Sequence, residues 1–416
     1  MRPARHPRGA AGAGSSHTAQ CTQILTDSGT GDSDVSEHEH DHGDLPEGAQ
    51  AELERLAECL GSLHDPASGR ILDELDADIE VGYEDGSVLV GITLGYPCDS
   101  QEDDWRDRIQ EACMPTLRGG PLGEAHLHFE LFSEVPTTEA GEVPEHLRGV
   151  KNIVAVASGK GGVGKSTTAV NLALALAAEG ASVGLLDADI YGPSLPTMLG
   201  TEGVRPKVKE HKFFLPVEAH GLKTMSLGYL LTEDTPAVWR GPMASGALNQ
   251  ILTQTLWCDD GGELDYLIVD MPPGTGDIQL TLAQKARLAG AVIVTTPQDL
   301  ALVDAIKGVE MFRKVSVPVL GIVENMSLHT CSQCGHTEPV FGSGGGERIA
   351  AEYDTGLLGQ LPLAMAIREG TDRGLPSVIA EPDSEVAQHY REIARRAAAE
   401  IWLSAEQGAG PEIEIG

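Results

Sequence analysis

A glycine-rich stretch near the middle of the chain has the residue types that polyphosphate binding requires. Its members are Gly159, Lys160, Gly161, Gly162, Val163, Gly164, Lys165, Ser166 and Thr167. Glycines let the backbone curl until several N–H groups point at one anion, while a lysine reaches the terminal phosphates and a serine hydroxyl joins the shell of Mg²⁺. Apolar residues at 153–158 predict a buried strand before the stretch, and residues 169–178 predict a helix after it. This order of strand, loop and helix indicates a nucleotide-phosphate site.

Acidic residues follow two further apolar runs, where they could serve the same nucleotide. Asp187 and Asp189 come after residues 182–186, and Asp270 ends the run 266–270. Carboxylates can hold a hydrated Mg²⁺ ion and orient an attacking water, although acids that only cap a loop would look the same. Downstream, Gly274 could offer its backbone N–H to a γ-phosphate and let the loop move on hydrolysis.

Asn325 follows another apolar run, residues 319–323. A side-chain amide has both a donor and an acceptor, so it can pair with the edge of an adenine base. A purely structural asparagine at a strand end is the alternative. Because nothing in the chain resembles the guanine-selecting NKxD pattern, we expect ATP rather than GTP.

Cys331 and Cys334 form a CxxC pair flanked by His329 and His336, and no second CxxC occurs. A zinc ion could use all four side chains, although histidines so close in sequence would strain a tetrahedron. A redox pair would ordinarily open a helix, which this segment does not predict. Two copies of the pair, joined across a dimer axis, would supply the four thiolates of a [4Fe–4S] cluster.

Strand and helix patterns alternate through the chain beyond residue 149, with strands predicted at 153–158, 182–187, 266–270, 291–295 and 318–323. This alternation predicts an α/β fold with a doubly wound, mostly parallel sheet and a site at the carboxyl ends of its strands. A smaller α-β-β-α-β pattern precedes it. We predict a disordered acidic, histidine-rich extension at 1–48, a small α+β domain at 49–133, a linker at 134–149, a nucleotide-binding domain at 150–403 and a tail at 404–416.

Composition excludes several classes of partner. The 416 residues contain 63 acidic and 29 basic side chains, so a net charge of −34 argues against nucleic acid and anionic membranes. No run of 18 apolar residues predicts a membrane span. Seven scattered cysteines do not predict a disulfide framework, and a reducing cytoplasm fits them best. Cys59, Cys98 and Cys113 each stand alone in the sequence, which predicts buried or idle thiols.

Taken together, the motifs resemble the Mrp/ApbC iron–sulfur cluster carriers, which belong to the MinD-like class of P-loop ATPases with a "deviant" loop. The matching strings are the glycine-rich loop with its additional Lys160 and the sequences DADIYGPS, DMPPGTGD, ENMS and CxxCG. Residues 49–133 resemble a MIP18-type (DUF59) domain, in which Cys98 lies where some members carry a reactive cysteine. The resemblance covers nearly all of residues 49–400.

The resemblance implies a nucleotide-sandwich homodimer in which Lys160 crosses the interface to the partner's nucleotide. Lys160, Lys165 and Asp189 would act in hydrolysis, with Asp189 positioning the attacking water. Gly274 would contact the γ-phosphate, and Asn325 would read the adenine. The residues expected to serve Mg²⁺, directly or through water, are Ser166, Asp187 and Asp270. Because nothing resembles an arginine finger within the chain, hydrolysis is expected to be slow.

For the cysteines, the resemblance implies a [4Fe–4S] cluster bridging the two subunits through Cys331 and Cys334. The implied partners are apo iron–sulfur proteins and a cluster-assembly scaffold, with neither nucleic acid nor membrane involved. Two alternatives remain from the sequence: a zinc-stabilised ATPase with another client, and an ATP-dependent dimerisation switch of the MinD/ParA kind. The switch would have no use for the CxxC pair, and its basic C-terminal helix is not present in the acidic residues 404–416.

Overall fold

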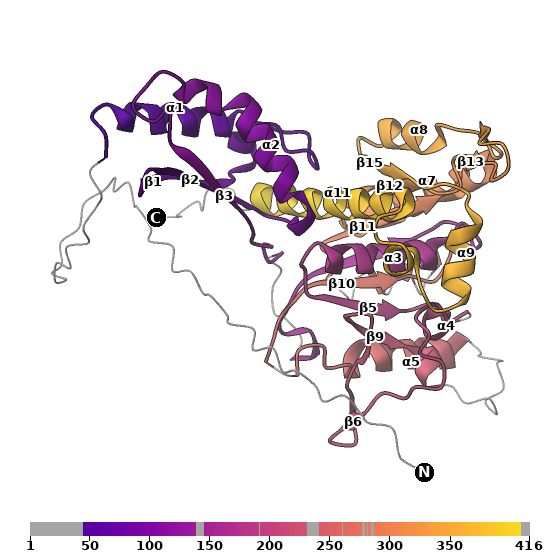
Figure 1. Ribbon diagram of the computed structural model, residues 1–416. Helices are drawn as coiled ribbons and strands as arrows, with labels where there is room; N and C mark the ends of the chain where they lie inside the picture. The colour runs from indigo at the N-terminus through magenta and orange to yellow at the C-terminus, as the bar shows by residue number, and fades with distance from the viewer. Residues whose placement is uncertain are drawn as a thin grey trace, which may run out of the picture.

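The computed structural model describes residues 45–138, 145–190, 192–230, 241–259, 261–276, 279–280, 282–283 and 287–408. These residues form a three-stranded sheet and an eight-stranded sheet, both packed against helices, and two short hairpins (Figure 1). Residues 1–44 of the predicted acidic, histidine-rich extension, residues 139–144 of the predicted linker and residues 409–416 of the predicted tail lie outside the described residues. Within the described part of the chain, no helix is both long and apolar enough to cross a membrane.

The eight strands of the large sheet are β4 (Val150–Ala157), β5 (Val183–Asp187), β8 (Val217–Ala219), β9 (Leu222–Ser226), β10 (Leu264–Asp270), β11 (Gly290–Thr295), β12 (Val319–Glu324) and β15 (Leu357–Gln360). Their spatial order is β15-β12-β11-β4-β10-β5-β9-β8. Neighbouring strands run parallel except β8 and β9, which are antiparallel. The prediction of a doubly wound, mostly parallel sheet is therefore confirmed, and five of its strands coincide with the predicted runs.

Helices cover both faces of this sheet. One face packs against α3 (Lys165–Ala178) and α11 (Glu385–Gly408), and the other against α5 (Gly241–Gln254), α7 (Asp299–Lys314) and α8 (Gly345–Glu352). Along β4, Val154 and Val156 join the α3 core while Ala155 and Ala157 join the α7 core, as the alternation of a strand requires. Helix α11 continues past residue 403 into the predicted tail.

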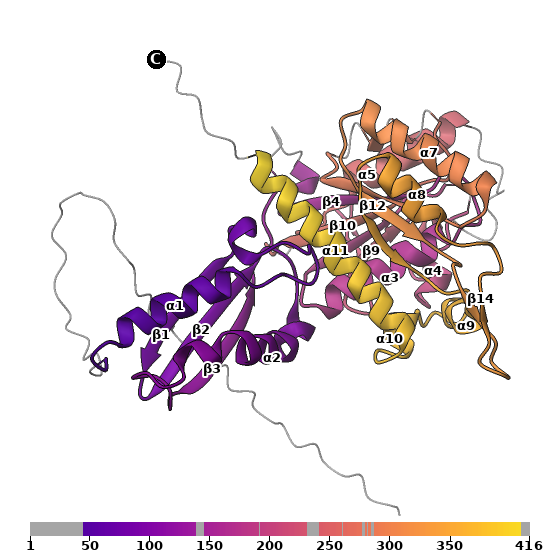
Figure 2. The same cartoon turned by 90° about the horizontal axis from the view of Figure 1, so that it is seen from above.

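The connections contain short elements. They are α4 (Leu195–Met198), α9 (Met365–Asp372), α10 (Ser377–Ala380), the hairpin of β6 (Val208–Lys209) with β7 (Phe213–Phe214), and the hairpin of β13 (His329–Thr330) with β14 (Thr337–Glu338). In both views the β13–β14 hairpin lies at the end of the molecule away from the three-stranded sheet (Figures 1 and 2).

The three-stranded sheet and its two helices form a small unit in the predicted α-β-β-α-β order. Its elements are α1 (Ala49–Gly61), β1 (Asp78–Glu84), β2 (Ser87–Leu94), α2 (Glu102–Ala112) and β3 (His126–Ser133). The central strand β2 pairs antiparallel with β1 and parallel with β3. On α1, the buried Leu53, Leu56 and Leu60 recur every three or four residues, so one face of the helix is apolar and packs on the core.

The cysteines of the small unit are not all isolated. The Sγ atoms of Cys59 in α1 and Cys113 at the end of α2 lie 2.7 Å apart, although 54 positions separate them in the chain. The two cysteines are isolated in the sequence, and the packing of the helices brings them together in the fold. Cys98 lies elsewhere and is 1% exposed; burial, reinforced by nearby carboxylates, raises its pKa to about 12. A neutral buried thiol does not fit a reactive role for Cys98.

The small unit packs against α11 and against the C-terminal end of α3 (Figures 1 and 2). Trp402 of α11 contacts Tyr96, with ring centroids 6.2 Å apart. Beside this contact, the fully buried Glu179 accepts a hydrogen bond from Ser100 Oγ at 2.7 Å and forms an ion pair with Arg395 at 2.7 Å. Because α3 begins in the glycine-rich loop and ends beside Glu179, one helix connects that loop to the small unit.

Replacing Glu179 with alanine is expected to lower the free energy of unfolding by about 3–5 kcal/mol, because the largely buried Arg395 guanidinium would lose its ion-pair partner. Urea unfolding followed by circular dichroism measures the loss. The matched control is Asp372→Ala, which removes the exposed pair of Arg368 and Asp372 and should cost less than about 1 kcal/mol. Equal effects of the two substitutions would show that burial of the Glu179 pair does not matter.

Candidate functional site

The glycine-rich loop connects β4 to α3 at the carboxyl edge of the large sheet. Gly162 and Gly164 have φ angles of 83° and 86°, a left-handed conformation that other residues rarely adopt. A Cβ atom on Gly164 would lie 2.2 Å from Asn325 Nδ2, and one on Gly159 would lie 1.9 Å from the backbone oxygen of Asp304 in α7. The loop is thus held between α7 and the end of β12, and glycine is required for both close approaches.

The lysine that starts α3 lies among three other predicted site residues. Lys165 Nζ is 2.5 Å from Asp270 Oδ1, 3.3 Å from Ser166 Oγ and 3.8 Å from Asp189 Oδ2. The Lys165 side chain is only 6% exposed, so these contacts replace much of the water that an ammonium group normally keeps. The structure therefore gathers one cation, two carboxylates and a hydroxyl at the start of the phosphate-binding helix.

Asp187 faces Asp270 across the adjacent ends of β5 and β10. Burial, reinforced by the charge of Asp270, raises the pKa of Asp187 to about 7. Burial also raises the pKa of Asp270, against the opposing effect of Lys165. Two buried carboxylates this close disfavour their own ionisation, and a divalent cation beside them would relieve the repulsion. The donor set of carboxylates and a serine hydroxyl is the hard-oxygen set that suits Mg²⁺.

The hydrogen-bond partners of Asp187 were missed by the sequence analysis. Ser226 Oγ donates to Asp187 Oδ2 at 2.9 Å from the end of β9, the strand next to β5. The other donors are the backbone N–H groups of Asp189, Ser194 and Leu195. These bonds fold the loop after β5 around the Asp187 carboxylate, so Asp187 positions the backbone of Asp189. No spacing in the sequence indicates Ser226, because β9 was not predicted.

Asn325 and Gly274 make contacts within the protein that their predicted roles did not include. Asn325 Nδ2 donates to the carbonyl of Val163 at 2.8 Å, and its Oδ1 accepts from Met326 N at 2.9 Å. The amide therefore ties β12 to the phosphate loop, and its adenine contact stays a prediction. Gly274, with φ of 98°, donates its N–H to the carbonyl of Ser158 at 3.0 Å. A contact between Gly274 and a γ-phosphate would require this bond to open.

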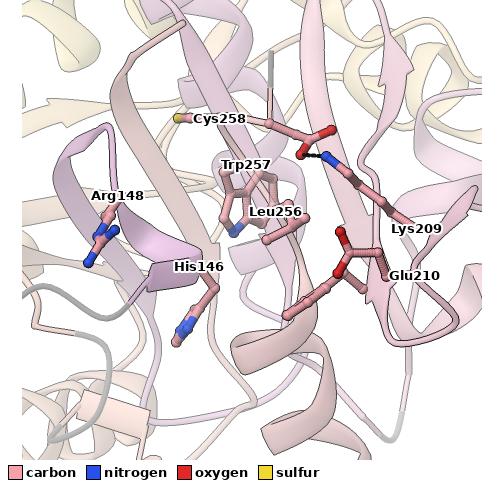
Figure 3. Close-up of a pocket in the computed structure, with 9 residues that line it drawn as sticks. His146, Arg148, Lys209, Glu210, Leu256, Trp257 and Cys258 are labelled. Atoms are coloured by element: carbon pink, nitrogen blue, oxygen red, sulfur yellow. Dashed lines mark hydrogen bonds and ion pairs between the residues drawn. The ribbon is translucent and has the colours of Figure 1, made fainter. Parts of the chain in front are cut away.

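A pocket of about 280 Å³ lies at the opposite edge of the sheet (Figure 3). Its lining comes from the segments before β4 and β10 and from the β6–β7 hairpin, and consists of His146, Arg148, Lys209, Glu210, Phe213 and residues 256–259. The pocket thus sits at the amino ends of the strands, whereas open α/β sheets bind their ligands at the carboxyl ends. Its Lys209 is already paired with Asp259 at 2.5 Å. We assign it no part in the nucleotide site.

The CxxC pair lies on the turn of the β13–β14 hairpin. Cys331 follows β13 directly, its N–H donates to the carbonyl of His336 at 2.9 Å, and its own carbonyl accepts from Gly335 N at 2.9 Å. Cys331 is half-buried and Cys334 is exposed. Both thiols are therefore held by a tight turn at the surface, where a large ligand or a partner protein can reach them.

The chain supplies these thiols with few further ligands. His329 Nδ1 lies 3.0 Å from the carbonyl of Leu363, which fixes the ring toward the body of the protein. Among the described residues, no group of three or more His, Cys, Asp or Glu side chains is placed to hold a metal ion. Two thiolates make half of a tetrahedral site. A tetrahedral site would therefore need ligands from outside the described part of this chain.

The hydrogen bonds around Cys331 favour its thiolate form. Hydrogen bonds from the backbone N–H groups of Gln333 and Cys334, and from the Cys334 thiol, lower the pKa of Cys331. A lowered pKa gives more thiolate at neutral pH, an advantage that disappears once the pH exceeds the pKa of an ordinary thiol.

In the metal-free protein, we expect the alkylation rate of Cys331 to rise with pH around a midpoint below ~8.5, the value of a free cysteine. Iodoacetamide labelling with peptide mass spectrometry gives that midpoint. Cys334→Ala removes one donor and should shift it upward. A midpoint at or above ~8.5 in the wild type would contradict the role of these hydrogen bonds.

Next to the glycine-rich loop, the surface carries an exposed cation and exposed apolar side chains. Lys160 is exposed, while its carbonyl accepts a hydrogen bond from Ser158 Oγ at 2.9 Å. In the first turns of α7, the helix that contacts Gly159, Leu300 is 76% and Val303 is 53% exposed. Large apolar side chains beside a binding loop are typical of a surface that another protein covers.

Comparison with known proteins agrees with this geometry. Residues 149–398 match the ParA family model described as NUBPL iron-transfer P-loop NTPase. The chain is 51% identical over 351 residues to an iron-sulfur cluster carrier protein of Escherichia coli strain K12, covering 84% of this chain and 93% of that one. It is 66% identical over 249 residues to an iron-sulfur cluster carrier protein of Pseudomonas fragi, covering 60% and 85%.

A solved structure illustrates the similarity of fold. It is a nucleotide-binding protein of Archaeoglobus fulgidus in complex with ADP, 37% identical, with a TM-score of 0.50 and coverage of 58% of this chain and 92% of that chain. The matched share corresponds in size to the part of the chain that contains the large sheet. The ADP bound to that protein is consistent with a phosphate site at the glycine-rich loop of this chain.

Proposed function

Because the chain belongs to the NUBPL iron-transfer P-loop NTPase family, we propose that Cys331 and Cys334 bind the iron–sulfur cluster that this carrier delivers to apo-proteins. The observation that supports the assignment is the surface CxxC turn, with one thiol exposed and the other activated by backbone N–H groups. A cargo that must leave needs ligands that solvent and a recipient can reach. A buried site would hold the cluster but could not release it.

We propose that the cluster is of the [4Fe–4S] type and bridges two copies of the chain. A [4Fe–4S] cluster takes four thiolates, and each chain offers two on its hairpin. The exposed Lys160 and the exposed Leu300 and Val303 beside the loop support a dimer that also closes over the nucleotide. In a two-fold dimer the same surface serves both partners, so two hairpins and two loops face their counterparts.

The nucleotide site would work through Lys165, Asp189 and the acidic pair of Asp187 and Asp270. Lys165 would hold the terminal phosphates, and its present contacts with Asp270 and Asp189 would be exchanged for phosphate oxygens. Asp187 and Asp270, with the Ser166 hydroxyl, would hold Mg²⁺, which supplies positive charge to the phosphates. Asp189, 15% exposed and anchored through its N–H to Asp187, would orient the attacking water.

Because ATP and the cluster would bind at the same dimer interface, the binding of one would affect the binding of the other. ATP favours whichever dimer geometry binds it better, and hydrolysis removes that preference. The bond between Gly274 N–H and the Ser158 carbonyl is a contact that could change between those states. The proposed partners are an assembly scaffold that donates the cluster and apo-proteins that accept it. A reducing compartment such as the cytoplasm would keep the two thiols free for this exchange.

Anaerobic reconstitution of the full-length protein with iron and sulfide tests this assignment. We expect about four irons and four sulfides per dimer, a dimer by light scattering, and recovery of activity when the loaded protein is mixed with an apo [4Fe–4S] enzyme. Zinc at one ion per chain or per dimer, without sulfide, would overturn the carrier assignment for these cysteines. Four irons held by a single chain would retain the cluster but reject the bridge.

A further inference from the structure

We propose that Cys59 and Cys113 are a redox-sensitive thiol pair that closes to a reversible disulfide within the small unit. Both cysteines are unbridged, and their Sγ atoms lie 2.7 Å apart. A disulfide bond is ~2.0 Å long, so closing the pair requires a movement of well under 1 Å. This inference concerns a site separate from the CxxC pair and does not depend on the proposed function.

The two sulfurs are held in place by the elements that carry them. Cys59 lies in the last turn of α1, where its carbonyl accepts a hydrogen bond from Ser62 Oγ at 2.7 Å. Cys113 caps α2, and its carbonyl accepts from Thr116 Oγ1 at 2.6 Å. A further hydrogen bond joins α1 to the loop that precedes β3, since Glu52 Oε2 accepts from Leu122 N at 2.9 Å. The two sulfurs are therefore close because the end of α1 packs against the end of α2.

A metal ion is a poorer explanation of the pair. Two thiolates bound to one zinc at ~2.3 Å in a tetrahedron would lie ~3.8 Å apart, farther than these sulfurs. No third His, Cys, Asp or Glu side chain joins them among the described residues. The β13–β14 hairpin, which carries the CxxC pair, lies at the end of the molecule away from the small unit in both views (Figures 1 and 2). The two cysteine pairs therefore cannot share a ligand within one chain.

The exposure of the two thiols predicts which of them is oxidised first. Cys59 is half-buried, whereas Cys113 is fully buried, so a peroxide reaches Cys59 first. Burial and the neighbouring Cys59 sulfur raise the pKa of Cys113, which keeps Cys113 protonated while Cys59 reacts. With hydrogen peroxide as oxidant, the Cys59 thiolate takes one oxygen to become a sulfenic acid and releases hydroxide, which becomes water by taking up the proton that the thiol had lost. Cys113 then attacks that sulfur, loses its proton and displaces a second water, leaving the disulfide.

Closing the bridge would link positions 54 residues apart, from the last turn of α1 through β1 and β2 to the end of α2. A cross-link of that length restricts the unfolded chain more than the folded one. We therefore expect oxidation to raise the melting temperature of the full-length protein's first unfolding transition by about 5 °C or more, and dithiothreitol to reverse the rise.

The test is differential alkylation of the full-length wild-type protein after treatment with one equivalent of hydrogen peroxide. Free thiols are blocked with N-ethylmaleimide, the protein is reduced with dithiothreitol, and the released thiols are labelled with iodoacetamide for peptide mass spectrometry. We expect Cys59 and Cys113 to carry the second label together, and their peptides to be found joined before reduction. The matched control, Cys258→Ser, removes another half-buried cysteine and should leave this pattern unchanged.

Single variants distinguish a bridge from two independent oxidations. In Cys113→Ala, Cys59 should accumulate as a sulfenic acid that dimedone traps, whereas the wild type should show at least ten-fold less adduct because Cys113 consumes it. Cys59→Ser keeps the test open if the Cys113 variant does not fold, since it should abolish the rise in melting temperature. Complete first-label alkylation of Cys59 in the oxidised wild type, or a bridge from Cys59 to another cysteine, would overturn the proposal.

Discussion

Replacing both Cys331 and Cys334 with alanine is expected to abolish iron and sulfide binding, and with it cluster transfer, while ATP hydrolysis continues. The reason lies in the ligand count, because we propose these two thiols as the ligands from each chain, and no group of three or more His, Cys, Asp or Glu side chains is placed to hold a metal among the described residues. Without them, the proposed dimer would lose the four thiolates that its two hairpins offer to iron. Metal analysis after anaerobic reconstitution, and a transfer assay with an apo [4Fe–4S] enzyme, measure the loss, which we expect to exceed ~100-fold.

The double substitution should leave the fold intact. Both side chains are on a surface turn, so their removal should change the free energy of unfolding by no more than about 0.5 kcal/mol. The matched control is the Cys98→Ala variant, whose thiol is buried in the small unit. If the double variant still binds four irons and four sulfides per dimer, the ligands lie elsewhere. If the Cys98 variant alone loses transfer, the small unit takes part in the chemistry.

Much of the nucleotide site could be predicted because of a simple property of parallel sheets. The carboxyl ends of neighbouring strands meet at one edge, so residues that follow strands in the sequence become neighbours in space. Asp187 and Asp270 end predicted strands, and the structure places them opposite each other, with Asp270 in contact with Lys165. The glycines of the loop were predictable for a similar reason, since only glycine fits the positive φ angles at 162 and 164.

Other parts of the site depend on packing that no spacing reveals. Strands β8, β9 and β15 are only three to five residues long, too short for periodicity to distinguish them from loops. Ser226, which hydrogen-bonds Asp187, was missed along with β9. The engagement of Asn325 with the Val163 carbonyl was also unpredictable, because an asparagine at a strand end suits a base and a backbone equally well.

The pairing of Cys59 with Cys113 shows the same limit more strongly. Each helix was predictable from its own pattern, but the rotation and offset of α1 relative to α2 were not. A change of one residue in that offset would separate the sulfurs by several ångströms, since each helical residue adds ~1.5 Å of rise and ~100° of rotation. The cysteines are scattered in the sequence, and only the fold brings these two into contact.

Alanine at Lys160 is expected to reduce ATP turnover by about 10²–10³-fold without measurable loss of stability. Lys160 is exposed and lies five positions before Lys165, too early in the loop to reach the phosphates of its own site. If it acts, it acts across a dimer interface as a charge on the partner's nucleotide, and charges placed on a transferring phosphoryl group typically contribute factors of this size. Phosphate release by the wild type and the variant, at equal protein concentration, measures the change.

Lys165→Ala provides the contrast. It should also reduce turnover by at least 10²-fold, but it should in addition lower the free energy of unfolding of the nucleotide-free protein, because the buried Asp270 would lose its cation. Mixing the two variants tests whether Lys160 acts on the partner's nucleotide.

If Lys160 works in trans, a mixture of Lys160→Ala and Lys165→Ala chains contains heterodimers in which one nucleotide site lacks both lysines and the other keeps both. Turnover should then recover to a fraction of the wild-type rate, whereas a lysine acting only within its own chain would leave the mixture as inactive as its parts.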